Sequence, residues 1–195
     1  MKEPTFYKIV KAPLVAVFKG IYKPAFVGTE NIPENGRIIL AGNHTSNLDC
    51  ILVAGSTKRC VHFLAKDELM KGPLKYIFGS LGIIPVNRRT KDPQAINMAE
   101  EYLKDEKLIG IFPEGTINRT DDIIMPFKFG AVKMANDVST PIIPFTITGK
   151  YKAFKKSVTI TFFEPFTVEN GDVQAANDKL MEIVKTKLIK EGHKQ

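Results

Sequence analysis

Cysteine is scarce in this sequence, and long apolar runs are absent from it. Two cysteines, Cys50 and Cys60, are too few for a disulfide framework or a cysteine-rich metal site. Because structural disulfides belong to oxidising compartments, this scarcity favours a reducing one. No stretch approaches the roughly 18 uninterrupted apolar residues that a membrane-spanning helix needs. With 195 residues, 44% of them hydrophobic, the chain is suited to a single domain with its own core.

Acidic residues are outnumbered, since 28 Lys and Arg stand against 21 Asp and Glu and give a net charge of +7. A basic protein favours anionic partners, namely nucleic acid, phosphorylated small molecules or an anionic membrane surface. No RNP-like aromatic signature, zinc-finger spacing or basic-region heptad accompanies the charge. Binding to nucleic acid would therefore depend on charge alone, and we expect no nucleic-acid partner.

Residues 1–25 lack the ending of a signal peptide but have the pattern of an amphipathic helix. At about 100° per residue, apolar side chains gather on one side of this helix: Phe6, Ile9, Val10, Leu14, Val17, Phe18 and Ile21. Lysines fall on the other side: Lys8, Lys11, Lys19 and Lys23. Such a helix can lie in a membrane interface, with its lysines on anionic headgroups. It can equally pack its apolar stripe on the rest of the domain, and the two interpretations are compatible.

Residues 26–195 alternate between short apolar runs and helical patterns, which is the arrangement of an α/β fold. The apolar runs are Ile38 to Ala41, Val61 to Ala65, Ile83 to Val86, Leu108 to Phe112, Ile142 to Ile147 and Val158 to Phe163. Their hydrophobicity is continuous rather than alternating, so we expect strands covered on both faces. Helices are predicted from Asp92-Pro93 through Leu103 and from Asp172 through Leu188. The sequence predicts one domain with a central, largely buried mixed sheet flanked by helices, preceded by the basic amphipathic helix.

The most informative motif is a histidine and an aspartate, His44 and Asp49, just after the first of these apolar runs. Residues five apart lie on different faces of a helix, so a turn that lets Asp49 curl back toward His44 is the better placement. A carboxylate on one imidazole nitrogen fixes the tautomer and leaves the other nitrogen free as a general base. This is two-thirds of a Ser-His-Asp triad with no obvious serine, which indicates that the substrate supplies the hydroxyl. A structural histidine is the alternative interpretation of the pair alone.

Two arginines, Arg88 and Arg89, follow the apolar run that ends at Val86. Forked guanidinium donors at the end of a buried strand suit a phosphate group. Taken alone, the two arginines are better explained by a solvated basic turn.

A carboxylate also follows an apolar run, because Glu114 stands between Pro113 and Gly115. In a tight turn this carboxylate can accept a hydrogen bond from a substrate hydroxyl. Gly115 and Thr116 can expose backbone N–H groups to an anion. A plain turn at the end of a strand is the competing interpretation.

Four blocks of sequence resemble, in order and spacing, the motif blocks of the glycerolipid acyltransferase family, and most closely its 1-acylglycerol-3-phosphate (lysophosphatidic acid) acyltransferases. The blocks are His44 to Asp49, Phe63 to Leu69 leading to Arg88, Phe112 to Thr116, and Phe127 to Gly130 running into Thr140 to Pro144. The similarity covers about residues 28–170. The family often continues its third block with Arg-Ser, whereas this chain has Ile117-Asn118 before Arg119. Either Arg119 takes over that position or a phosphate contact there is weaker.

The resemblance implies acyl transfer from an acyl thioester, either acyl-CoA or acyl carrier protein. The acceptor would be the free sn-2 hydroxyl of 1-acylglycerol-3-phosphate, and the product phosphatidic acid for phospholipid biosynthesis. In that reaction His44 would act as the base and Asp49 would orient it. The implied substrate-binding residues are Arg88 for the phosphate, with Lys66 and Arg89 as secondary candidates, Glu114 for the glycerol, and Gly115 and Thr116 for the polar end.

No cofactor is implied beyond the acyl-CoA or acyl carrier protein co-substrate, and no metal, because His62 and His193 show no ligand spacing. The expected location is a peripheral one on the cytoplasmic face of an anionic membrane. Three alternatives remain open: an acyltransferase for another lysophospholipid or glycerol phosphate, a non-catalytic lipid-binding module of the same fold, and a covalent intermediate on Cys50. A serine hydrolase built on Ser80 is disfavoured, because the motif around it lacks the first glycine of a nucleophile elbow.

Overall fold

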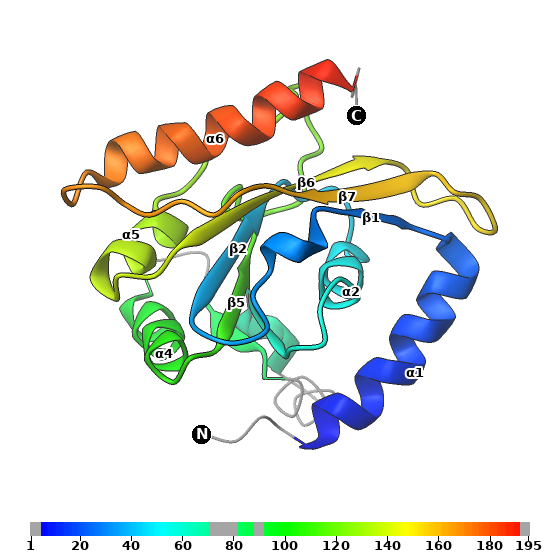
Figure 1. Cartoon of the computed structure of the whole chain (residues 1–195), viewed down its shortest axis with the longest axis horizontal. Helices are drawn as coiled ribbons and strands as arrows, with labels where there is room; N and C mark the ends of the chain where they lie inside the picture. The colour runs from blue at the N-terminus through cyan, green and yellow to red at the C-terminus, as the bar shows by residue number, and fades with distance from the viewer. Residues whose placement is uncertain (1–4, 71–81, 88–91, 192–195) are drawn as a thin grey trace.

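The computed structural model describes residues 5–70, 82–87 and 92–191, and its centre is a seven-stranded sheet (Figure 1). The strands are β1 (Ala25–Val27), β2 (Ile38–Gly42), β3 (Val61–Lys66), β4 (Ile84–Val86), β5 (Leu108–Ile111), β6 (Ile142–Gly149) and β7 (Val158–Phe162). Their order in the sheet is β1-β7-β6-β2-β5-β3-β4. Neighbouring strands are parallel except for β6 and β7, which pair antiparallel. The sheet is therefore mixed, as predicted.

Helices cover both faces of the sheet (Figure 1). The helices are α1 (Thr5–Tyr22), α2 (Asp49–Ala54), α4 (Pro93–Lys104), α5 (Gly130–Asp137) and α6 (Val173–Lys190), with short 3-10 turns η1 (Thr29–Asn31) and η2 (Asp67–Met70). Along β2, Ile39 packs in the core formed with α4, α5 and α6, whereas Ile38 and Leu40 pack on the opposite side, with Phe18 of α1 and Leu52 of α2. Because both faces of β2 are buried, its sequence is apolar without alternation. The expected α/β fold is confirmed.

Each predicted apolar run contains a strand, although β1 and α5 were not predicted. β1 has only three residues at the edge of the sheet, two of them exposed, so it carries no hydrophobic pattern to detect. α5 begins at Gly130 without a side-chain cap, which removes the usual start signal of a helix. The predicted helix after Asp92 is present, and the Asp92 side chain caps it by accepting from the Ala95 N–H at 3.1 Å.

The N-terminal helix α1 packs on the domain with one face and exposes another. Tyr7 and Phe18 are buried, while Ile9 and Val17 are 66% and 61% exposed. Lys11, expected on the polar side, faces inward, since its Nζ donates to the carbonyls of Thr57 and Arg59 at 2.7 Å. The expected packing on the domain is thus present and leaves apolar surface uncovered. Among the described residues, none of the helices combines the length and apolar character needed to span a bilayer.

Asn43 extends the contact between β2 and β6 beyond the strand ladder. Its Nδ2 donates to the Ile147 carbonyl at 3.0 Å, and its Oδ1 accepts from the Ile147 N–H at 2.8 Å. Both residues are fully buried, so no water replaces these bonds if they are lost. The side chain of Asn43 therefore fixes the chain at the point where β2 ends.

Replacing Asn43 with Ala should lower the free energy of unfolding by about 2–4 kcal/mol, because it leaves two buried backbone groups of Ile147 unsatisfied. Urea denaturation measures this change. The matched control is Asn47→Ala at an exposed position four residues on, which should change stability by less than about 0.5 kcal/mol. Equal losses in the two variants would contradict the structural role of Asn43.

Candidate active site

The predicted site residues that the structure describes lie at the carboxyl ends of parallel strands. His44 follows β2, Glu114 follows β5, and Lys66 ends β3. These strands are neighbours in the order β2-β5-β3 and run in parallel, so their carboxyl ends share one edge of the sheet. Ligand sites of open α/β sheets are typically located at this edge.

His44 and Asp49 are in direct contact. The Nδ1 of His44 lies 2.9 Å from Oδ2 of Asp49, and the Asp49 carboxylate is completely buried. A carboxylate only accepts hydrogen bonds, so Nδ1 carries the proton when the ring is neutral and Nε2 has the free lone pair. The turn between the two residues thus brings them together as the sequence spacing predicts.

Further donors fix the Asp49 carboxylate. The backbone N–H groups of Thr45 and Ser46 donate to Oδ2 at 2.6 and 2.8 Å. The Thr45 hydroxyl donates to Oδ1 at 3.3 Å, and the Tyr151 hydroxyl donates to the same oxygen at 2.7 Å. A buried carboxylate needs several such donors to remain charged away from water. The orientation of Asp49 therefore depends on the turn itself and on a loop about a hundred residues later.

The loop after β5 holds the backbone and ring of His44. Glu114 Oε1 accepts from the His44 N–H at 2.8 Å, and the Asn118 N–H donates to the His44 carbonyl at 3.0 Å. Phe112 stacks on the imidazole with ring centroids 4.0 Å apart and planes 12° apart. The histidine is thus fixed through its N–H, its carbonyl and one face of its ring.

Glu114 is 2% exposed and bonds two segments of backbone at once. Its Oε1 accepts from the His44 N–H, and its Oε2 accepts from the Met125 N–H at 2.9 Å. Burial raises the pKa of the Glu114 carboxyl above its ordinary value, while the N–H groups of Met125 and His44 act in the opposite direction. Each carboxylate oxygen has two lone pairs, so these bonds leave acceptor capacity for a substrate hydroxyl. The predicted contact of Glu114 with glycerol remains a prediction.

Gly115 makes the turn that places Glu114. Its φ of +74° lies in the left-handed region that favours glycine, and its N–H donates to the Phe112 carbonyl at 2.9 Å. A Cβ at this position would lie 2.8 Å from Nζ of Lys128, so the end of that flexible side chain would have to shift. Thr116, the next residue, is exposed.

Among the described residues, neither Lys66 nor Arg119 contacts His44 or Asp49. Lys66 and Arg119 are exposed, and Cys50 is half-buried beside Asp49. Arg88 and Arg89 lie outside the described residues. They follow β4, which stands three places from β2 in the strand order. Their predicted contact with a phosphate group therefore remains a prediction.

Tyr151 is a site residue that the sequence did not reveal. It follows β6, and its ring packs edge-on against Phe18 and Tyr22 of α1, with centroids 6.0 and 5.6 Å away. Burial, followed by the charge of Asp49, raises the pKa of the Tyr151 phenol, so the hydroxyl stays protonated and donates. The separation of 102 residues from Asp49 leaves no local pattern that could have identified it.

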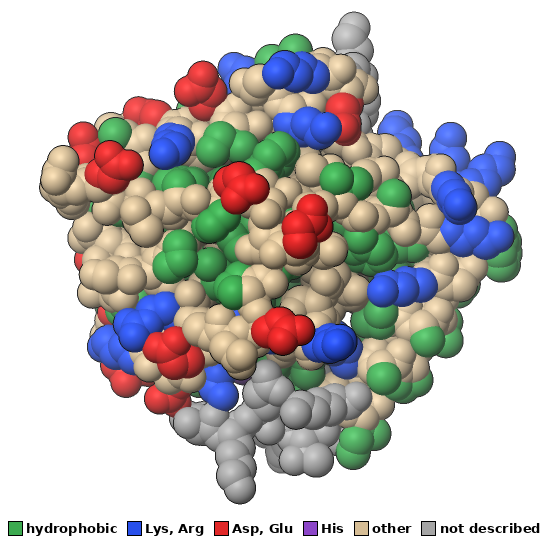
Figure 2. Space-filling view, viewed as in Figure 1, with side chains coloured by type: hydrophobic (Ala, Val, Ile, Leu, Met, Phe, Trp, Pro, Cys, Tyr) green, Lys and Arg blue, Asp and Glu red, His purple; other side chains and the backbone are tan. Residues whose placement is uncertain are grey.

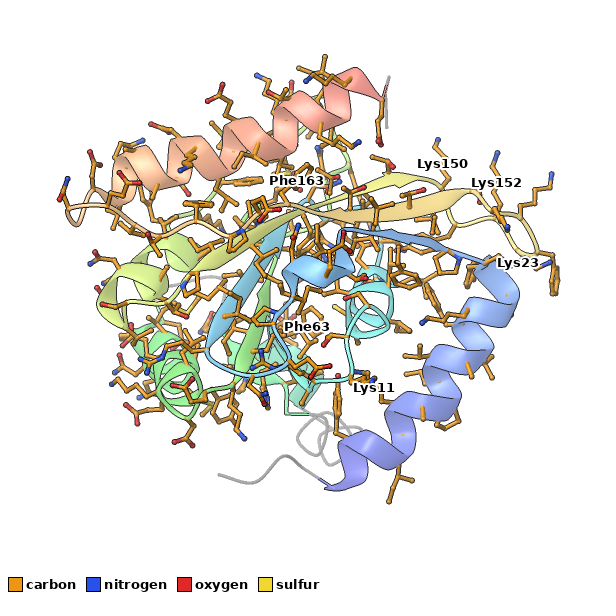
Figure 3. All side chains as sticks on the ribbon, viewed as in Figure 1. Lys11, Lys23, Phe63, Lys150, Lys152 and Phe163 are labelled. Carbon is orange, nitrogen blue, oxygen red and sulfur yellow. The ribbon has the colours of Figure 1, made fainter. Side chains whose placement is uncertain are left out.

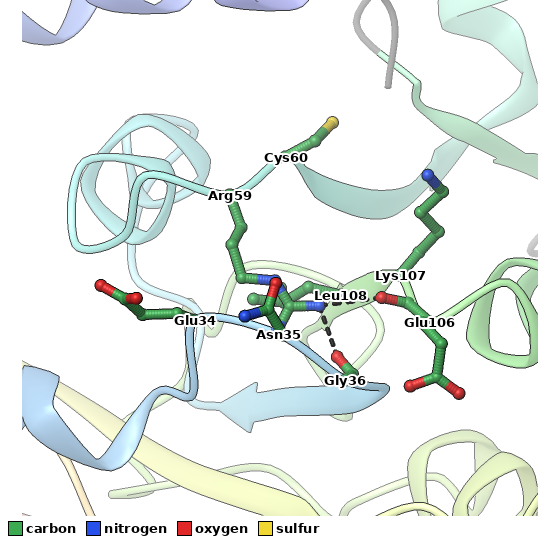
Figure 4. A pocket seen from close by; sticks show the side chains of 8 residues that line it. All are labelled: Glu34, Asn35, Gly36, Arg59, Cys60, Glu106, Lys107 and Leu108. Atoms are coloured by element: carbon green, nitrogen blue, oxygen red, sulfur yellow. Dashed lines mark hydrogen bonds between the residues drawn. The ribbon is translucent and has the colours of Figure 1, made fainter. Parts of the chain in front are cut away.

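A cavity of about 320 Å³ lies elsewhere, near the start of β2 and β5 (Figure 4). Its lining includes Arg59, whose guanidinium donates to the carbonyls of Pro33, Gly36 and Glu106. These bonds join the loops at the amino ends of the strands, so the arginine is part of the scaffold. Within the described ranges, no cluster of three or more His, Cys, Asp or Glu side chains is placed to hold a metal ion.

The buried pair of His44 and Asp49 lies at the carboxyl edge of a mixed α/β sheet, with Nε2 of the imidazole left to act as a base. The family model described as Acyltransferase matches residues 23–148, which is more than half of the sequence. The chain belongs to the acyltransferase family.

Named relatives include 1-acyl-sn-glycerol-3-phosphate acyltransferases. The chain is 34% identical over 134 residues to that of Borreliella burgdorferi, covering 67% of this chain and 53% of the relative. It is 33% identical over 124 residues to that of Bacillus subtilis, covering 62% and 60%. The chain thus spans about half the length of the curated relatives it matches. The crystal structure of the 1-acyl-sn-glycerophosphate acyltransferase PlsC from Thermotoga maritima is similar, with a TM-score of 0.75, 25% identity, and coverage of 97% and 82%.

Replacing Tyr151 with Phe should lower kcat about tenfold or more while leaving KM values nearly unchanged, because it removes one donor from the Asp49 carboxylate and keeps the ring. Steady-state kinetics of acyl transfer measures the change. The matched control is Tyr22→Phe, which removes a hydroxyl from the same aromatic cluster. If both variants lose kcat equally, the bond to Asp49 is not the cause.

Proposed function

We propose that this protein transfers an acyl group from a thioester to the free sn-2 hydroxyl of 1-acylglycerol-3-phosphate, giving phosphatidic acid for phospholipid biosynthesis. The observation that carries the proposal is the contact of 2.9 Å between His44 and the buried carboxylate of Asp49, in a chain that belongs to the acyltransferase family. The names of its relatives from Borreliella burgdorferi and Bacillus subtilis support this acceptor.

In the proposed reaction, Nε2 of His44 takes the proton of the acceptor hydroxyl as its oxygen attacks the thioester carbonyl. The bond from carbonyl carbon to sulfur then breaks, and the same proton passes from His44 to the departing thiol. Asp49 holds the Nδ1–H of His44 and stabilises the imidazolium that forms between the two steps. General-base assistance of this kind typically contributes about 10² to 10⁴-fold.

The proposed substrate contacts extend along the carboxyl edge of the sheet. Arg88 binds the acceptor phosphate, with Lys66 and Arg89 as secondary contacts. Glu114 accepts from the glycerol. The backbone of Gly115 and Thr116 lines the polar end of the site. The acyl donor is acyl-CoA or acyl carrier protein, which serves as co-substrate, and no further cofactor takes part.

The proposed location is the cytoplasmic face of an anionic membrane, where the protein is peripheral. Residues 1–25 would form the membrane-interface segment and residues 26–195 the acyltransferase domain. This location is supported by α1, whose side chains of Ile9 and Val17 are more than half exposed. A lipid acceptor would then reach the site from the surface on which the protein lies.

Thiol release from palmitoyl-CoA, with and without 1-acylglycerol-3-phosphate, tests the proposal. Release that depends on the acceptor is expected. Release without the acceptor would indicate a thioesterase, and a preference for another lysophospholipid would change the substrate. Absence of release with both acyl-CoA and acyl carrier protein would indicate a lipid-binding module instead.

Replacing His44 with Ala should reduce acceptor-dependent thiol release by about 10² to 10⁴-fold, since the base is lost. Circular dichroism should show an unchanged fold, because the backbone bonds of residue 44 to Glu114 and Asn118 do not need the imidazole. A folded variant that keeps full turnover would rule out His44 as the base.

Replacing Arg88 with Ala should raise the KM for 1-acylglycerol-3-phosphate more than the KM for the acyl donor, because only the acceptor loses its phosphate contact. Arg119→Ala, on the exposed loop after Glu114, is the comparison variant. An equal rise of both KM values in Arg88→Ala would argue against a phosphate role, and a larger effect of Arg119→Ala would transfer that role to Arg119.

A further inference from the structure

The loop of residues 150–157 joins β6 to β7 and presents an aromatic side chain to solvent. Phe154 is 72% exposed, more than any other large hydrophobic residue described. Its φ of +60° is unusual for a bulky residue, so the surrounding loop must hold it. Backbone strain of this kind is found at binding and functional sites, so the surroundings of Phe154 bear on its role.

Hydrogen bonds keep the loop in this shape and attach it to α1. The Ser157 hydroxyl donates to the Lys150 carbonyl at 2.7 Å and accepts from the Lys152 N–H at 3.2 Å. The Phe154 N–H donates to the carbonyl of Ile21 near the end of α1. The tip of the loop and the N-terminal helix therefore form one rim of the molecule (Figure 1).

This rim is strongly cationic. Its exposed lysines are Lys19, Lys23, Lys150, Lys152, Lys155 and Lys156. The sequence has no acidic residue at positions 4–29 or 138–163, so no carboxylate from either segment offsets the charge. Figure 2 shows lysine and arginine side chains gathered on this side of the molecule, and Figure 3 places Lys23, Lys150 and Lys152 around the end of α1 and the loop.

We propose that the loop of residues 150–157 docks on an anionic lipid bilayer, with Phe154 inserted among the acyl chains and the surrounding lysines on the headgroups. An exposed aromatic side chain with exposed lysines at neighbouring positions of its loop suits a membrane surface, which is apolar in its interior and anionic at its headgroups. The exposed apolar residues of α1, Ile9 and Val17, belong to the same rim and add to the inserted surface.

The docking loop also bears on the active site. Tyr151, three residues before Phe154, donates to Asp49. Docking at Phe154 would therefore set the dyad beside the bilayer that supplies the acceptor. In this respect the inference rests on the proposed function, because only a lipid acceptor gives such a placement a purpose.

The absence of tryptophan from the sequence allows a site-specific test. Phe154→Trp introduces a single indole at the tip of the loop, and Ile189→Trp introduces one on α6, at a position 53% exposed. On adding phosphatidylglycerol vesicles, we expect a blue shift and quenching by brominated acyl chains for Trp at 154 and neither change at 189. Unchanged emission at 154 in vesicle-bound protein would overturn the proposal.

Charge removal tests the headgroup contact. The triple variant K152S/K155S/K156S should bind phosphatidylglycerol vesicles on the order of 100-fold more weakly in sedimentation. The control K133S/K185S/K190S removes the same charge from exposed positions on α5 and α6 and should bind nearly as well as the unaltered protein. An equal loss of vesicle affinity in both variants would show that only the net charge matters, and it would contradict docking through this loop.

Activity separates this inference from the proposed function. With a short-chain acceptor that is monomeric in solution, the loop variant should keep its turnover, whereas with acceptor embedded in vesicles its turnover should fall. If vesicle binding is unchanged and the KM for acyl-CoA rises instead, the lysines bind the phosphates of the donor and the docking proposal fails. If the unaltered protein binds vesicles but transfers no acyl group, the docking proposal stands and the proposed function is wrong.

Discussion

The carboxylate of Asp49 is the point on which the rest of the site depends. It is fully buried and accepts from the imidazole of His44, the N–H groups of Thr45 and Ser46, and the hydroxyls of Thr45 and Tyr151. With fewer donors the buried carboxylate would turn away from the imidazole, which would then lose its fixed tautomer. The dyad is therefore a property of the whole cluster of donors and cannot be reduced to two residues at a given spacing.

The hydrogen bonds around His44 and Asp49 come from three loops that are distant in the sequence. The turn after β2 supplies His44 and Asp49, the loop after β5 fixes the histidine through Glu114 and Asn118, and the loop after β6 supplies Tyr151. Parallel strands deliver these loops to one edge of the sheet. Through Tyr151 the cluster also contacts α1, so the surface proposed to meet the membrane and the proposed base share one short chain of contacts.

Much of this arrangement could be predicted from the sequence, and the rest has identifiable physical reasons for escaping prediction. Strands such as β2 and β6 are buried on both faces and therefore appear as continuous apolar runs. The contact of His44 with Asp49 is local, because the two residues are only five positions apart and a turn joins them. Tyr151 could not be found in this way, because only the strand order brings it to Asp49. Lys11 was misplaced because its charge suggested the outer face of α1, whereas two backbone carbonyls satisfy its ammonium group on the inner face.

The central claim is that His44 is held with its proton on Nδ1, so that Nε2 is free to accept the proton of a substrate hydroxyl. Nitrogen-15 NMR of histidine-labelled protein at a pH where the ring is neutral tests it directly, with a His44→Gln sample to assign the resonance among the three histidines. The account predicts a protonated Nδ1 and an unprotonated Nε2 for His44. A neutral ring protonated on Nε2 would contradict it, since the nitrogen proposed as the base would then be blocked.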